Sequence, residues 1–130
     1  MKLFSLSKAN ALIPVLEPLL DELLTKRREL AIRLLESDPG VRPPSSSGTS
    51  VSSPTRRIEA RRNTELKAEV IRLMGRIEAH GCVLKDVTLG LVDFPALRGG
   101  TPVFLCWKMG EPEVAHWHGA DETFVDRKPL

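Results

Sequence analysis

Hydrophobic side chains recur every three or four residues along two stretches of the chain, which is the spacing of one helix face. In the first stretch the apolar series is Ile13, Leu16, Leu20, Leu23, Leu30 and Leu34, and in the second it is Ile58, Leu66, Val70, Leu73 and Ile77. We therefore predict helices over residues 8–36 and 55–80, packed against each other as a long antiparallel hairpin.

The helix ends and one irregularity are also predicted from residue types. Ser7 is expected to cap the first helix, and Gly81 is expected to end the second. Pro14 and Pro18 each lack an N–H and crowd the carbonyl four residues back, so a kink or a false start of the helix is expected near residues 10–18.

Each apolar series contains one polar member. An antiparallel hairpin in which facing positions sum to about 90 places Arg27 opposite Asn63. The two side chains then either fix the register of the hairpin or point to water at a frayed end, and the sequence does not decide between these alternatives.

Residues 37–54 are rich in Ser, Pro and Gly and contain only two Val that could pack. Such a composition cannot bury enough apolar surface to offset its ordering entropy. We expect a flexible linker here.

The apolar pattern changes to alternation in residues 82–118, which predicts strands. A loop is expected from Gly90 to Thr101, followed by a hairpin that turns at residues 110–111. Pairing across that turn sets Lys108 opposite Glu113, Cys106 opposite Ala115 and Phe104 opposite Trp117. The predicted fold class is α+β, a two-helix hairpin followed by a small antiparallel sheet, with an irregular tail over residues 119–130.

The length of 130 residues is that of a single domain, and the net charge is only +2. This balance hides a division, because residues 1–80 hold 14 basic and 10 acidic residues and residues 81–130 hold 5 and 7. Two cysteines without a CxxC motif, and the lack of a long apolar run, favour a cytoplasmic protein with no membrane segment.

Three motifs carry a family resemblance: GLVDFP at 90–95, LCWKMGE at 105–111 and WH at 117–118. In these motifs, and in its opening and closing segments, the chain resembles the small prokaryotic proteins of domain of unknown function family 2203. His116 departs from the bulky aromatic residue expected at its position. The resemblance implies no activity, because the family has none assigned.

His116 and His118 are two residues apart on a predicted strand, so both rings project from one face and could share a metal ion. Asp93 could supply an oxygen ligand, and Zn²⁺ or Fe²⁺ would suit this set. In the predicted register Cys106 lies on the opposite face and is a poor ligand. The competing interpretation is structural: His118 donates to Asp93 or to a backbone carbonyl and pins the loop to the sheet.

A wider ligand site is predicted around the same residues. Its members are Asp93, Trp107, Glu111, Trp117, His118 and Arg127. The two tryptophans and Cys106 also suit a buried core, and the sequence identifies no catalytic residue.

Basic residues gather at the start of the second predicted helix, where Arg56, Arg57, Arg61 and Arg62 lie. They could bind the phosphates of a nucleic acid or a ribosome. Glutamates at pairing distance, such as Glu65 beside Arg61, equally suit a solvated face whose charges pair within each helix.

The sequence favours a non-enzymatic interaction protein whose helices associate with a second copy, as in a coiled coil, or with a protein partner. Leu12, Leu19, Leu24 and Leu35 widen the apolar face beyond what one partner helix covers. A metal-binding protein or metal-dependent enzyme is the first alternative, and a nucleic-acid-binding or ribosome-associated module is the second.

Overall fold

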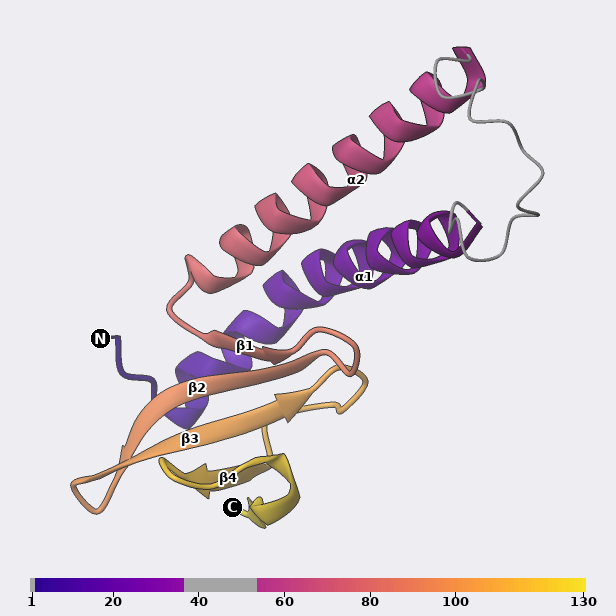
Figure 1. Cartoon of the computed structure of the whole chain (residues 1–130). Coiled ribbons are helices and arrows are strands. Elements are labelled where there is room, and N and C mark those ends of the chain that lie inside the picture. Colours follow the sequence, from indigo (N-terminus) through magenta and orange to yellow (C-terminus); the bar gives the residue numbers. More distant parts are fainter. Residues whose placement is uncertain (1, 37–53) are drawn as a thin grey trace.

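The computed structural model describes residues 2–36 and 54–130 and confirms the α+β class (Figure 1). Two helices are followed by a five-stranded antiparallel sheet in the order β1-β2-β3-β4-β5. The elements are α1 (Leu6–Glu36), α2 (Pro54–Glu78), β1 (Val83–Asp86), β2 (Leu91–Arg98), β3 (Thr101–Lys108), β4 (His116–Gly119), the 3-10 turn η3 (Phe124–Asp126) and β5 (Lys128–Pro129). The linker predicted at 37–54 lies almost wholly outside the described residues.

Helix α1 begins earlier than predicted and is continuous through both prolines. The backbone N–H of Lys8 donates to Ser5 Oγ at 3.1 Å, so Ser5 rather than Ser7 caps the helix. The expected false start near Pro14 and Pro18 is wrong, because α1 is one uninterrupted helix from Leu6 to Glu36. Both prolines lie on the exposed side of α1, four residues apart, where water can bond the carbonyls that they leave without a partner.

Helix α2 ends as the sequence predicts. Gly81 follows its last turn with a φ of +97°, a backbone conformation that L side chains rarely adopt. The chain then turns directly into β1, so α2 and the sheet are joined by only a few residues.

The two helices run antiparallel, but with a different offset from the one predicted. Arg33 Nε donates to Asn63 Oδ1 at 2.9 Å. Arg27 reaches Thr88 instead, in the turn between β1 and β2, with 3.3 Å between Nη1 and Oγ1. The predicted Arg27–Asn63 pair is therefore wrong, because α1 packs along the sheet as well as along α2 and its middle lies beside that turn.

The sheet corrects two predictions. The predicted loop after Gly90 is strand β2, whose eight residues pair with β3 from Leu91↔Lys108 to Arg98↔Thr101. In addition, β3 and β4 pair one residue away from the predicted register, with Phe104 opposite His118 and Cys106 opposite His116.

The register differs because residues 109–115 leave the ladder instead of forming a tight hairpin. Glu111 N–H donates to the Lys108 carbonyl at 3.0 Å, and Val114 N–H donates to Asn10 Oδ1 on α1 at 2.7 Å. The connection from β3 to β4 is thus anchored to a helix, which local turn rules could not include.

This one-residue difference decides which side chains share a face of the sheet. One face packs on the helices and contributes Val92, Phe94, Ala96, Val103, Leu105 and Trp107 to the hydrophobic core. The other face carries Asp93, Cys106 and His118. Cys106 therefore lies beside His118 and not opposite to it, as the sequence had predicted.

The tail has more structure than predicted. After η3, β5 pairs with β4 through His116↔Pro129 and Trp117↔Lys128. Leu130 N–H also donates to the Ala115 carbonyl at 2.9 Å. The C-terminal segment therefore lies against the sheet, on the side away from α2 (Figure 1). None of the helices in the described ranges is long and apolar enough to cross a membrane.

Candidate functional site

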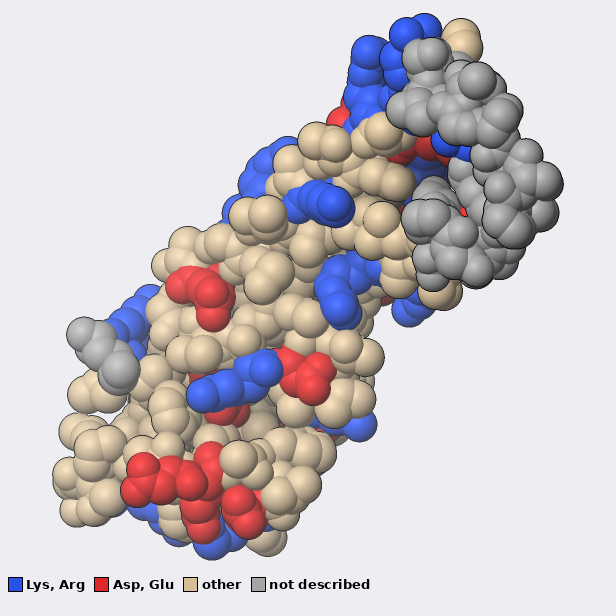
Figure 2. All heavy atoms as spheres, in the orientation of Figure 1, with Lys and Arg blue, Asp and Glu red and all other residues tan. Residues whose placement is uncertain are grey.

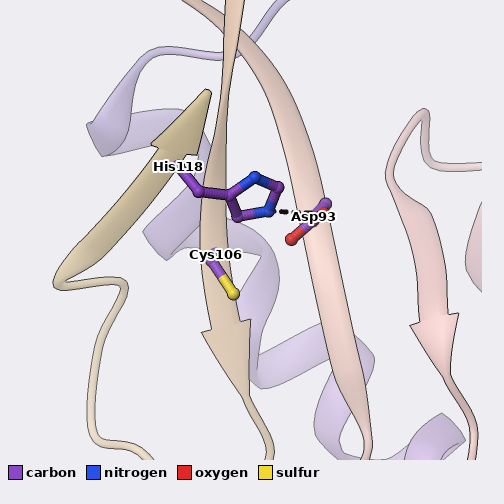
Figure 3. A group of neighbouring side chains, drawn as sticks. All are labelled: Asp93, Cys106 and His118. Atoms are coloured by element: carbon purple, nitrogen blue, oxygen red, sulfur yellow. Dashed lines mark hydrogen bonds and ion pairs between the residues drawn. The ribbon is translucent and has the colours of Figure 1, made fainter. Parts of the chain in front are cut away.

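Three potential metal ligands meet on the sheet face that points away from the helices (Figure 3). Asp93 comes from β2, Cys106 from β3 and His118 from β4, and all three are buried. One ligand atom from each residue lies within 4.8 Å of the others. We call these residues the triad. Adjacent strands bring them together, because Asp93 pairs with Cys106 and β4 lies next along the sheet.

Both ring nitrogens of His118 face oxygen atoms. Nε2 lies 2.9 Å from Asp93 Oδ2, and Nδ1 lies 2.9 Å from the carbonyl of Gly119. A carbonyl can only accept, so Nδ1 carries a proton and donates it. The structural interpretation of His118 thus describes these contacts correctly. The same contact through Nδ1 is the one that orients metal-binding histidines, and Nε2 would become a ligand where a metal replaces its hydrogen bond to Asp93.

The two cysteine thiols are held in the protonated form. Burial raises the pKa of Cys106 to about 12, and the neighbouring Asp93 carboxylate adds to the rise while the Arg127 guanidinium opposes it. Burial likewise raises the pKa of Cys82 to about 11. Cys82 lies outside the triad, where its Sγ donates to the Ile77 carbonyl at 3.3 Å.

We expect neither thiol to react with iodoacetamide in the native protein at about pH 8, because the thiolate is the attacking species and both sulfurs are buried. Mass spectrometry should find both cysteines modified only after unfolding in urea. Rapid alkylation of native Cys106, at the rate seen for the unfolded chain, would contradict this description of the site.

A cavity of about 250 Å³ opens directly on the triad. Its remaining walls come from β1, from the start of β2 and from the segment after β4: Lys85, Asp86, Leu91, Glu122, Thr123 and Phe124. The segment after β4 is fixed in place, since Glu122 Oε1 accepts from Gly119 N–H and from Lys128 Nζ, both at 2.6 Å. The triad is therefore the floor of a pocket and not a part of the closed core.

Glu111 and Arg127, predicted for the ligand site, form an ion pair with two hydrogen bonds of 3.0 and 2.8 Å. Glu111 Oε1 also accepts from Lys108 N–H at 2.7 Å. His116 Nδ1 lies 3.9 Å from Glu111 Oε2 and is not in the triad. Cys106 thus takes the third ligand position that the sequence analysis gave to His116.

The Glu111 carboxylate should stabilise the protein in a pH-dependent way. Burial favours its neutral form, but the Arg127 guanidinium and the Lys108 N–H outweigh burial and hold the pKa of Glu111 below its ordinary value. A glutamate side chain in an unfolded chain has a pKa of about 4.3. The stabilisation is therefore present above that pH and is lost as the pH falls through the lower folded-state pKa.

We expect Glu111→Gln to unfold at lower urea concentration than the wild type at about pH 7, with the difference shrinking below about pH 4. Glu113→Gln, at an exposed neighbouring carboxylate, is the matched control and should change little. Equal effects of the two substitutions at neutral pH would show that the pair with Arg127 adds nothing.

The two tryptophans predicted for the ligand site lie elsewhere. Trp107 belongs to the core, and its Nε1 donates to the Glu111 carbonyl at 3.0 Å. Trp117 is partly buried against the same core, with Arg98 and Lys128 on its ring at 4.6 and 4.7 Å from the centroid. The sequence placed them at the site because it could not tell which face of each strand they occupied.

On the face shown in Figure 2, Lys and Arg follow the helical hairpin and gather at its far end, and a patch of Asp and Glu lies on the sheet end. Arg56, Arg57, Arg61 and Arg62 lie at the start of α2. Arg62 is engaged with carboxylates: its side-chain nitrogens lie 3.3 Å from Glu29 and 3.6 Å from Glu65. Glu29 is thus paired with an arginine of the other helix. Nucleic-acid binding by this end of the hairpin stays a prediction.

Seven of the nine residues that line the pocket were not predicted from the sequence: Cys106 as a neighbour of His118, and Lys85, Asp86, Leu91, Glu122, Thr123 and Phe124 in the walls. The motif LCWKMGE contains Cys106, but the register predicted from the sequence places this cysteine on the face opposite to His118. A signal was available in the alternation of β3, where Leu105 and Trp107 already filled the core face and left Cys106 to the other one.

The comparisons with known proteins agree with the motifs. The family model described as "Uncharacterized conserved protein (DUF2203)" matches residues 2–130, so the chain belongs to this family. No curated protein and no solved structure is significantly similar to the chain. The resemblance predicted from the sequence is therefore confirmed, and the site must be interpreted from its own chemistry.

Proposed function

We propose that the protein binds one divalent metal ion, Zn²⁺, through Asp93, Cys106 and His118. The observation that carries the proposal is the triad itself: three buried ligand atoms within 4.8 Å of one another, at the floor of a pocket. Metal–ligand bonds of about 2.0–2.3 Å set tetrahedral ligand atoms roughly 3.3–3.8 Å apart. Only small movements of the three side chains would be needed.

The donor set supports zinc over iron. A thiolate, an imidazole and a carboxylate are all zinc ligands, and thiolates favour Zn²⁺ over harder cations. As metal ligands, Asp93 and Cys106 would both be ionised and would carry two negative charges, so a divalent ion would leave the site neutral. Zinc would displace the Cys106 proton and replace the Asp93–His118 hydrogen bond, so binding should release protons.

The number of ligands supports a reactive site more than a structural one. Structural zinc is held by four protein ligands, whereas catalytic zinc has three and keeps one position for water or substrate. Only Asp93, Cys106 and His118 group as ligands among the described residues, and the pocket lies beside them. The class of activity we infer is binding or activation of a small molecule at the metal.

Elemental analysis after dialysis against limiting Zn²⁺ tests the proposal. We expect one zinc per chain in the wild type and much less than one in Cys106→Ser and His118→Ala. Cys82→Ser is the matched control, because it removes the other buried thiol and should keep full zinc content. Equal zinc in all four proteins would show that the metal binds elsewhere, and no zinc in the wild type would end the proposal.

Association through the helices, with a second copy or a protein partner, is a second candidate function. The exposed apolar side chains of the helices are the surface that could serve it. Leu12 and Leu19 pack against the chain's own core, so they are not left over for a partner. Leu35 and Ile58, 69% and 66% exposed, lie near the far ends of the helices. We expect any homo-oligomer or partner complex to use this end. Light scattering of Leu35→Ser beside the wild type measures whether it does.

A further inference from the structure

We infer that Lys85 and the metal together bind a small monocarboxylate in the pocket. This inference rests on the proposed metal site and names the class of ligand for its open position. The starting observation is a β-bulge in β1. Leu84 pairs with Val92 and Asp86 pairs with Leu91, so Lys85 is an extra residue with no partner on β2. Bulges redirect side chains and are frequent beside active sites.

The bulged residue faces the triad. The ammonium of Lys85 lies 5.1 Å from the centroid of the Phe104 ring, and that ring lies 5.5 Å from the ring of His118. Lys85 also lines the same cavity as the triad. Within residues 2–36 and 54–130 no carboxylate pairs with Lys85, whereas Lys128 at the other wall is paired with Glu122. A cation without a carboxylate partner therefore lines the same cavity as the proposed metal site.

The open coordination position of the metal and the Lys85 ammonium line the same small cavity and would together select an anion. One carboxylate oxygen would occupy the open metal position, and the other would accept a hydrogen bond from Lys85. The charge of the ligand is limited by Asp86 in the wall, whose carboxylate repels a dianion such as hydrogen phosphate. Leu91 and Phe124 offer apolar contact to a short carbon chain. A cavity of about 250 Å³ has room only for a small molecule.

The probe for this inference is acetate, added to protein loaded with Co²⁺ in place of zinc. Cobalt reports its ligands through its visible absorption, so binding of acetate should change the spectrum and saturate. We expect Lys85→Met to keep full cobalt content and to weaken acetate binding about ten- to a hundredfold, as for loss of a hydrogen bond to a charged group. Lys67→Met, at an exposed lysine of α2, is the matched control and should bind as the wild type does.

The outcomes separate the inference from the metal proposal. If cobalt binds as expected but acetate binds equally well to Lys85→Met and to the wild type, the role of Lys85 is overturned and the metal proposal is not affected. Tighter binding of hydrogen phosphate than of acetate overturns the preference for a monoanion. Failure of the wild type to bind cobalt at all overturns the proposed function, and this inference with it.

Discussion

Trp107→Ala should destabilise the protein by about 3–5 kcal/mol, the usual cost of truncating a buried aromatic residue. Its side chain is 0% exposed and lies in the core between the sheet and the helices. The substitution also leaves the Glu111 carbonyl without its 3.0 Å hydrogen bond from the indole. Since small domains have only about 5–15 kcal/mol of stability, this loss is a large share of the total.

Urea unfolding followed by circular dichroism measures the effect without relying on tryptophan fluorescence. Trp117→Ala is the matched control, because this ring is only partly buried and packs at the edge of the core. We expect it to cost less than half as much. Similar losses for the two variants would contradict the assignment of Trp107 to the core centre and of Trp117 to its edge.

The second large effect concerns Asp93 and His118, which are buried together on the other face. Replacing either residue alone leaves its partner as an uncompensated buried polar or charged group, which typically costs about 3–5 kcal/mol. Asp93→Leu and His118→Leu should each show a loss of this order. The double variant Asp93→Leu/His118→Leu should recover most of it, because an apolar pair of similar volume can replace a buried ion pair at little cost.

This double-mutant cycle separates a functional site from a structural one. If the pair serves the metal site, the double variant folds about as stably as the wild type and has lost zinc. If the pair mainly fixes β4 to the sheet across β3, the double variant stays as unstable as either single variant. Urea unfolding of the four proteins at about pH 7, in the presence of a chelator, measures the coupling between the two residues.

The helices could be predicted from the sequence because their signals are local. The apolar series of residues 8–36 and 55–80 and the glycine at 81 depend only on spacing and backbone preference. The errors arose where a tertiary contact decides the outcome. Arg27 turns to Thr88 because the sheet packs beside α1, whereas the change of cap from Ser7 to Ser5 is a local one.

The site depended on a single residue of register. Alternation predicted strands in residues 82–118, and Asp93 and His118 were both selected for their chemistry. The sequence predicts a tight turn after β3. In the structure the connection from β3 to β4 is longer than such a turn, and Val114 N–H donates to Asn10 on α1. A shift of one residue moves every side chain of a strand to the other face. The predicted register therefore gave His116 as the third ligand, where the structure has Cys106.

The most direct test of the central claim is a titration of the metal-free protein with Co²⁺, followed by the near-ultraviolet absorption of a cobalt–thiolate bond. The triad predicts one equivalent bound, with this absorption present in the wild type and in Cys82→Ser and missing in Cys106→Ser. An absorption that survives Cys106→Ser, or that disappears in Cys82→Ser, would contradict a metal site built from Asp93, Cys106 and His118.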